Sequence, residues 1–66
     1  MKIVKFKDGR YGIRRGTIIG YEFYDLIDSF WWSRDNFDGH RSSCTTSTLK
    51  HIQEIFNKIN DTGKAI

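Results

Sequence analysis

The sequence predicts an α+β fold: an antiparallel four-stranded meander that begins with an N-terminal β-hairpin, with one C-terminal helix packed on one face. Three observations predict this fold. Strand-like runs flank Asp8-Gly9 near the start of the chain, aromatic and β-branched residues dominate its middle, and apolar residues recur every three or four positions near its end. The chain has 66 residues, so we expect a single domain spanning 1–66.

Residues 2–7 and 10–15 are the expected strands of the hairpin. Asp8-Gly9 separates them, and this dipeptide favours a two-residue type I′ loop because both of its residues must adopt positive φ. Alternation along the two strands then gives the hairpin, which spans 1–16, an apolar side and a basic side. The apolar side would carry Val4, Phe6, Tyr11 and Ile13.

The aromatic strands lie within 17–35, where 21–27 forms the third strand and 30–34 the fourth. Neighbouring side chains on a strand point to opposite faces, so Trp31 and Trp32 cannot both enter one core. One of them should pack under the helix. The other should stand on the open face of the sheet, among Lys and Arg side chains of the hairpin.

The C-terminal part is predicted to be a loop at 36–46 followed by a helix at 47–61. Phe37 is the large apolar residue of the loop. Hydroxyl side chains at 45–48 are candidates for the helix N-cap. The helix should rest an apolar stripe on the sheet, and this stripe consists of Leu49, Ile52, Ile55, Phe56 and Ile59.

Composition narrows the class of protein. The single cysteine, Cys44, excludes an internal disulfide, and a domain this small is then commonly stabilised by oligomerisation. The first residues lack the apolar segment of a signal peptide, and no apolar run approaches the roughly 20 residues of a membrane span. We therefore expect a soluble, cytoplasmic homo-oligomer without membrane association.

The net charge of +3 is unevenly distributed. Six Lys and Arg stand against one Asp in 1–16, whereas five Asp and Glu stand against one Arg in 17–38. A basic end beside an acidic middle can bind an anionic partner or pair with the opposite region of a second copy. Glu22, Asp25 and Asp28 do not share one strand face as a catalytic carboxylate pair would. Solubility and cross-strand pairing with Lys or Arg are their expected roles.

Enzymatic signals are weak in this sequence. His40 and Cys44 stand four residues apart with Asp38 nearby, which suggests a Cys/His pair or part of a zinc site. One cysteine and two histidines, however, do not supply the usual four ligands of structural zinc. The sequence also lacks glycine-rich phosphate loops. We expect a protein that is not an enzyme, with no catalytic residue, no cofactor and no metal.

Arginines interleaved with aromatic residues are the strongest functional signal. Arginine matches phosphate with a two-pronged set of donors and aromatic rings stack on bases, so together they suit a nucleotide. Tyr11, Trp31 and Trp32 could instead be core or subunit interface, with arginines solvating its rim. The free N–H groups of a helix N-terminus are a further candidate for an anion. The candidate ligand-binding residues are Arg10, Tyr11, Arg14, Arg15, Trp31, Trp32, Arg34, Thr45, Thr46 and Ser47.

The whole chain resembles small bacteriophage proteins. It combines the hairpin KFKDGRYGIRRG, the aromatic strand FWWSR and a C-x-x-S-x-L helix entry at Cys44, Ser47 and Leu49. It is similar to the phage-encoded anti-defence sponge proteins of the anti-CBASS kind, which are viral proteins of host immune evasion. Those proteins are small oligomers that sequester cyclic oligonucleotide signals, such as cyclic GMP-AMP, without cleaving them.

The resemblance implies a symmetric homo-oligomer in the cytoplasm of the host bacterial cell, with nucleotide pockets between protomers. Residue chemistry, rather than family positions, assigns roles to individual side chains. The phosphate contacts would be Arg10, Arg14, Arg15 and Arg34, and the stacking residues would be Tyr11, Trp31 or Trp32.

Two other classes of function stay open. The first is a module that binds single-stranded nucleic acid on the same basic and aromatic face. It would bind longer oligonucleotides more tightly and lose affinity steeply with salt. The second is a protein-binding inhibitor of a host defence protein or nuclease, in which the acidic middle of the chain imitates nucleic-acid phosphates.

Overall fold

The computed structural model describes the backbone of residues 1–64 and the side chains of residues 1–61. Four strands form one antiparallel sheet in the order β1-β2-β3-β4, which confirms the predicted meander. The strands are β1 (Lys2–Lys5), β2 (Tyr11–Thr17), β3 (Gly20–Asp25) and β4 (Phe30–Ser33). The helical segments are α1 (Arg34–Phe37), η1 (Asp38–His40), α2 (Arg41–Cys44) and α3 (Leu49–Lys64).

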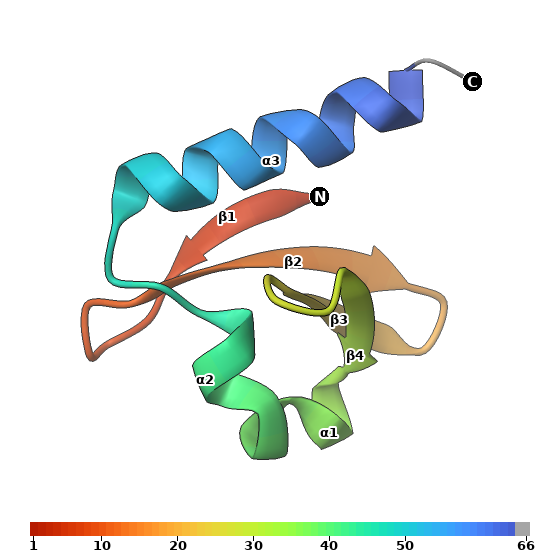
Figure 1. The fold of residues 1–66 in the computed structure, drawn as a ribbon. Coiled ribbons are helices and arrows are strands. Elements are labelled where there is room, and N and C mark those ends of the chain that lie inside the picture. The colour runs from red at the N-terminus through yellow and green to blue at the C-terminus, as the bar shows by residue number, and fades with distance from the viewer. Residues whose placement is uncertain (65–66) are drawn as a thin grey trace.

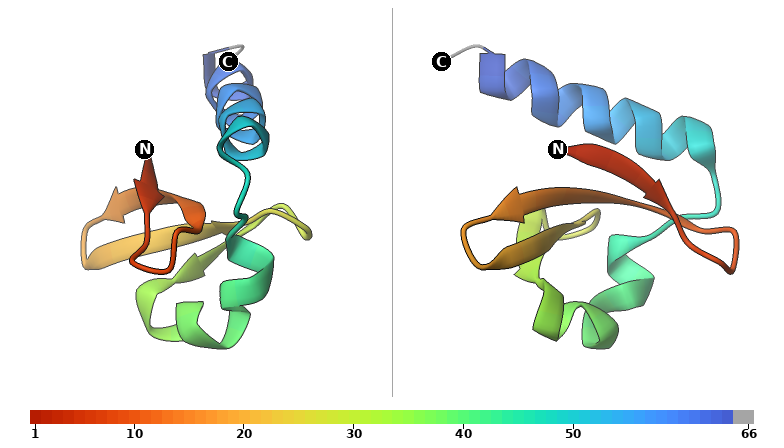
Figure 2. Two further views of the ribbon diagram at one scale, coloured as in Figure 1. Left: turned by 90° about the vertical axis from the view of Figure 1, so that its left-hand side faces the viewer. Right: turned by 180° about the vertical axis from the view of Figure 1, so that it is seen from behind.

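The sheet lies between two helical layers. The long helix α3 lies on one side, beside β1 and β2, whereas α1, η1 and α2 lie on the opposite side (Figures 1 and 2). We call the first side the α3 face, which carries Ile13 and Trp31, and the second the short-helix face, which carries Phe23 and Trp32. The side opposite α3 is not open as expected, because the short helices cover it. On the α3 face, however, the helix lies along β1 and β2, and Trp31 on β4 stands beside Arg15 of the hairpin strand β2, as the sequence predicts for one of the two tryptophans.

The hairpin has a different register from the predicted one. Ile3 pairs with Ile13 and Lys5 with Tyr11, so the strands are joined by a three-residue loop. Within this loop, the N–H of Gly9 donates to the carbonyl oxygen of Phe6 at 3.0 Å. Gly9 has a φ of +86°, a conformation that favours glycine. A shift of one residue moves side chains to the other face of a strand. The predicted division into an apolar and a basic side is therefore wrong.

The segment predicted as a loop at 36–46 is largely helical. Its chain runs through three consecutive single turns, α1, η1 and α2, and short turns of this kind show no helical periodicity that a sequence can reveal. Phe37 and Cys44 point from these turns into the core, and they are 7% and 0% exposed. Tertiary packing, rather than local propensity, holds this segment in place.

Aromatic rings form the core of the short-helix face. The ring of Phe37 lies 4.1 Å from that of Phe23 and 5.5 Å from that of Phe6, measured between centroids. Gly12 completes this contact, because a Cβ at this position would lie 3.1 Å from the Phe6 ring and 3.2 Å from the carbonyl oxygen of Cys44. The glycine lets β2 approach the end of α2 closely.

The completely buried side chains of the α3 face are aliphatic. Ile13 on β2 and Ile52 on α3 are both completely buried. Fewer residues of the predicted apolar stripe are buried than expected, because Leu49 is 43% exposed and Phe56 is half-buried. The helix begins two residues later and ends three residues later than the predicted 47–61. No helix within residues 1–64 is long and apolar enough to cross a membrane.

A buried carboxylate ties β3 to the short-helix layer. Asp25 is 1% exposed, and its Oδ1 accepts the backbone N–H groups of Ile27 and Asp28 at 2.9 Å each. Its Oδ2 accepts the indole Nε1–H of Trp32 at 2.9 Å and the hydroxyl of Ser43 at 3.1 Å. Burial raises the pKa of Asp25, but these four hydrogen bonds outweigh it and hold the pKa below its ordinary value. The expectation that Asp25 is a solvated surface residue is wrong.

Candidate functional site

The two tryptophans lie on opposite faces of β4, as their adjacency requires. Trp32 lies on the short-helix face, where His40 stacks on its ring with centroids 3.6 Å apart. Its indole nitrogen is committed to Asp25. Trp31 lies on the α3 face, where the guanidinium carbon of Arg15 stands 4.1 Å from its ring centroid and Tyr24 packs edge-on at 5.1 Å. Both tryptophans are partly buried, but Trp32 packs against the aromatic core, whereas Trp31 packs against Arg15 and Tyr24.

The predicted arginines do not form one site. Arg15 pairs with Glu22 at 2.7 Å, which is the cross-strand pairing expected for that glutamate. Arg14 points to the other face and stands 4.5 Å from the ring of Tyr21. Arg34 is largely exposed beside Asp35 at 3.9 Å, so its contact with protein is weak. These arginines lie on different faces of the sheet or at its edge.

A shallow hollow of about 460 Å³ lies where the β1–β2 loop meets the short helices. It combines two arginines, one from the loop and one from α2, with hydroxyl groups and a glycine backbone. Of the predicted ligand-binding residues, Arg10 and Thr45 line this hollow. The complete lining consists of Arg10, Asp38, Gly39, Arg41, Ser42 and Thr45.

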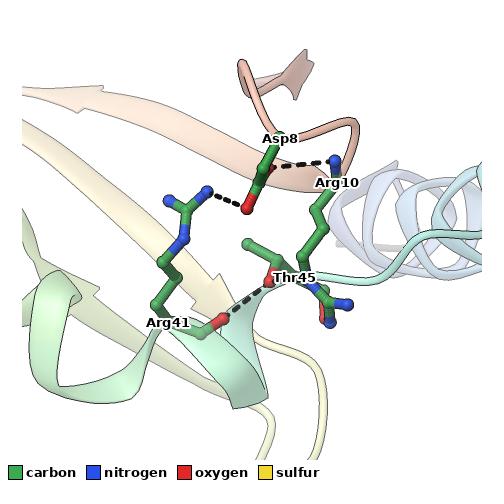
Figure 3. Close-up of polar contacts among 4 residues, drawn as sticks. All are labelled: Asp8, Arg10, Arg41 and Thr45. Atoms are coloured by element: carbon green, nitrogen blue, oxygen red, sulfur yellow. Dashed lines mark hydrogen bonds and ion pairs between the residues drawn. The ribbon is translucent and has the colours of Figure 1, made fainter.

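Arg10 is fixed at the hollow by two charge-assisted hydrogen bonds. Its Nε donates to the hydroxyl of Thr45 at 2.7 Å and its Nη2 to the carbonyl oxygen of the same residue at 2.7 Å. The Thr45 hydroxyl in turn donates to the carbonyl oxygen of Arg41 at 2.7 Å (Figure 3). Among the described residues, the Nη1 group of Arg10 makes no hydrogen bond, so two of its N–H groups remain for a ligand.

Arg41 is fixed from the other side of the hollow. Its Nη2 donates to Oδ2 of Asp8 at 2.7 Å (Figure 3). Its guanidinium carbon lies 4.7 Å from the ring centroid of Phe6. The hydrogen bond from Arg41 lowers the pKa of Asp8, so this carboxylate keeps its charge at lower pH than an ordinary aspartate does. Asp8 also accepts the backbone N–H of Arg10 at 3.2 Å. One loop carboxylate thus binds the guanidinium of Arg41 and the backbone of Arg10, while Thr45 holds the Arg10 guanidinium.

This arrangement gives the hollow the chemistry of an anion site. Both guanidinium groups are held by protein contacts before any ligand arrives, so little side-chain entropy is lost when an anion binds. Ser42 adds a hydroxyl that can donate to an oxygen. Asp38 on the lining opposes an anion, so any anion has to bind on the arginine side.

The remaining predicted residues lie next to the hollow without lining it. Tyr11 and Thr46 form an isolated antiparallel bridge. The N–H of Tyr11 donates to the carbonyl oxygen of Thr46 at 2.7 Å, and the N–H of Thr46 donates to the carbonyl oxygen of Tyr11 at 2.9 Å. This bridge places the end of α2 against the start of β2. Ser47 is exposed. Thr46 Oγ1 accepts the N–H of Thr48 at 3.3 Å, so these hydroxyls shape the chain before α3.

The Cys/His hypothesis finds no support in the geometry. Cys44 is completely buried, and burial together with the charge of Asp25 raises the pKa of its thiol to about 11. Such a thiol is not a nucleophile at neutral pH. His40 is stacked on Trp32. Within the part of the chain that the structure describes, no three His, Cys, Asp or Glu side chains are grouped as metal ligands.

No family model, curated protein sequence or solved structure matches this chain.

Sequence reasoning missed three residues that build the site. Arg41 stands in a segment without periodicity, and Asp8 was read purely as a turn residue. The sequence predicts Phe6 as a strand residue on the apolar side of the hairpin. In the structure, the guanidinium of Arg41 packs over its ring. The spacing of Asp8 and Arg10 around a glycine is a local signal for a loop carboxylate that accepts a backbone N–H, but nothing local predicts its pairing with Arg41.

Proposed function

We propose that this protein is a non-enzymatic binding protein that holds the phosphate of a nucleotide at the hollow between the β1–β2 loop and α2. The observation that carries the proposal is the convergence of Arg10 and Arg41 on one concave surface, with both guanidinium groups fixed in advance. Following the resemblance, we propose that the ligand is a cyclic oligonucleotide immune signal. The protein would sequester it as a phage-encoded homo-oligomer.

Phosphate is the anion that suits the two arginines best. A planar guanidinium presents paired donors that match the oxygen spacing of phosphate, and two such groups can bind different oxygens of one phosphodiester. A cyclic dinucleotide carries two phosphodiesters and few other charges. The proposal does not include hydrolysis, because the groups at the hollow offer no activated nucleophile and no metal ligand set among the described residues.

Binding would be measured by isothermal titration of the full chain with cyclic dinucleotides, matched linear dinucleotides and inorganic phosphate. We expect Arg41→Gln to weaken nucleotide binding by about tenfold or more, since a charge-assisted pair to phosphate is lost. Arg14→Gln is the matched control, because Arg14 stacks on Tyr21 outside the hollow and its loss should leave affinity unchanged. Arg41→Lys should recover only part of the affinity, because lysine lacks the fork.

Three outcomes would overturn the proposal. One is the absence of binding by the wild-type chain to every nucleotide in the panel. Another is an equal loss of affinity in Arg14→Gln and Arg41→Gln. The third is an affinity that rises with oligonucleotide length and falls steeply with salt, which would identify a single-stranded nucleic-acid-binding module instead. Thermal unfolding of each variant would separate loss of binding from loss of fold.

A further inference from the structure

Asp38 brings a carboxylate to the lining of a hollow that is otherwise suited to anions. It is exposed, and within residues 1–61 its side chain makes no hydrogen bond and no ion pair. Arg41 lies three residues further along the chain, a spacing that lets opposite charges meet on a helical turn. The Arg41 guanidinium nevertheless binds Asp8. Asp38 is therefore not needed to neutralise Arg41, and its carboxylate is left for a ligand.

The hollow thus offers a ligand two kinds of polar group. The Nη1 group of Arg10 and the Arg41 guanidinium can donate hydrogen bonds to an anion, whereas the Asp38 carboxylate can accept them from a donor. A bare anion is attracted by the arginines and repelled by Asp38. A ligand that carries an anionic group and, apart from it, N–H donors can bind both kinds of group. A nucleotide has this composition, and a volume of about 460 Å³ lies within the range of small-molecule sites.

The four bases differ in what their Watson–Crick edges offer a carboxylate. Guanine presents two neighbouring donors, the N1–H and the exocyclic N2 amine, and the two oxygens of a carboxylate can accept from both. Adenine and cytosine place a ring-nitrogen acceptor beside their amine, and uracil has a carbonyl oxygen on each side of its N–H. These acceptors repel a carboxylate. Guanine is therefore the base that fits an unpaired carboxylate best.

We infer that the hollow selects guanine nucleotides, with Asp38 accepting hydrogen bonds from N1 and N2 of the base while Arg10 and Arg41 bind a phosphate. The inference rests on the proposed function and specifies its ligand more closely. Asp38 acts here as a specificity-determining residue. Because hydrogen bonds to a charged group are strong, we expect a guanine nucleotide to bind about tenfold or more tightly than its adenine counterpart.

Isothermal titration of the full chain with cyclic di-GMP, cyclic di-AMP and inorganic phosphate would test this selection. We expect Asp38→Asn to weaken binding of cyclic di-GMP by about tenfold, because an amide offers one acceptor and one donor in place of two acceptors. Cyclic di-AMP should bind Asp38→Asn more tightly than the wild-type chain, since the amide matches the amine and N1 of adenine. Inorganic phosphate should also bind this variant more tightly, because a negative charge has been removed.

Other roles of Asp38 predict different signs. A residue that only maintained the local fold would, when changed to Asn, weaken the binding of all three ligands. A residue that only repelled anions would strengthen the binding of all three. Either result would overturn the inference. Thermal unfolding should be the same in Asp38→Asn and the wild-type chain, because this side chain makes no polar contact with the described protein.

Asp35→Asn is the matched control. It removes the same charge three residues earlier, from an exposed side chain that lies beside Arg34 and outside the lining of the hollow. The preference for guanine should be unchanged in this variant. An equal loss of the preference in Asp35→Asn and Asp38→Asn would contradict a direct contact between Asp38 and the base.

Failure of this inference and failure of the proposed function give different results. Equal binding of cyclic di-GMP and cyclic di-AMP, lost in Arg41→Gln, would overturn the inference and leave the function standing. No binding of either dinucleotide would overturn both. A preference for guanine that disappears in Asp38→Asn, together with the loss of binding in Arg41→Gln, would support both.

Discussion

The two layers that cover the sheet are held by different interactions. α3 rests on its side through aliphatic burial, with Ile13 and Ile52 completely enclosed. The short helices rest on the other side through aromatic contacts and a set of polar bonds that converge on Asp25 and on the two arginines of the hollow. A long amphipathic helix has some stability of its own, whereas single turns have none. The polar bonds therefore stabilise the single helical turns, which would not form on their own.

The largest expected effect comes from removing the centre of the polar network. Asp25→Ala should destabilise the protein by about 3–5 kcal/mol, because it leaves the Trp32 indole and the Ser43 hydroxyl without their buried acceptor. Urea unfolding followed by tryptophan fluorescence would measure this. Asp28→Ala, three residues away and exposed, is the control and should have little effect. A loss below about 1 kcal/mol in Asp25→Ala would show that the network is replaceable by water.

On the α3 face the corresponding test is Ile52→Ala. We expect a loss of about 3 kcal/mol, since a completely buried aliphatic side chain is replaced by a cavity. Phe56→Ala should cost less than its size suggests, because this ring is half-buried. Urea unfolding of both variants would rank them. The reverse order would mean that Phe56, rather than Ile52, anchors the helix.

The smallest of the three effects is the pH dependence of the stability, which tests the polar network on the short-helix face. Because the pKa of folded Asp25 lies below its ordinary value of 3.8, the deprotonated form is favoured by folding. This contribution to stability is fully present above the unfolded pKa and is lost as pH falls through the lower folded pKa. The urea midpoint should therefore fall in acid, and Asp25→Asn should flatten that dependence. An unchanged slope in Asp25→Asn would assign the acid sensitivity to another carboxylate, such as Asp8.

The sequence was informative about elements and poor about contacts between them. Alternation and three-to-four spacing predict the meander and α3, because both patterns are local. Asp8-Gly9 suits a two-residue loop as well as the three-residue loop that forms, so the hairpin register was misjudged by one residue. That single shift puts Ile3, rather than Val4, on the same face as Ile13. Packing of Phe6 against the short helices fixes the register, and this contact is distant in sequence.

The candidate site was predictable only in part, for the same reason. Arg10 and Thr45 were expected to contact a ligand, yet their separation by 35 residues hides the direct bond between them. The sequence leaves open which of Trp31 and Trp32 faces the core, because nothing local indicates that Asp25 binds the indole nitrogen of Trp32. Arg41 depends on a helical turn that only tertiary packing creates. Residue type indicated the chemistry, and the fold decided which side chains share a surface.

The Tyr11–Thr46 bridge has a consequence for how the chain folds. Neighbouring strands of the meander are close in sequence and can pair rapidly, whereas this bridge closes a loop of about 35 residues, and loop closure of that length is entropically slow. The hollow lies at this closure, where Arg10 and Thr45 join the same two segments. An anion bound there would lengthen the lifetime of the closed chain by mass action. Refolding and unfolding rates, measured with and without ligand, would then report on the site as directly as a binding isotherm does.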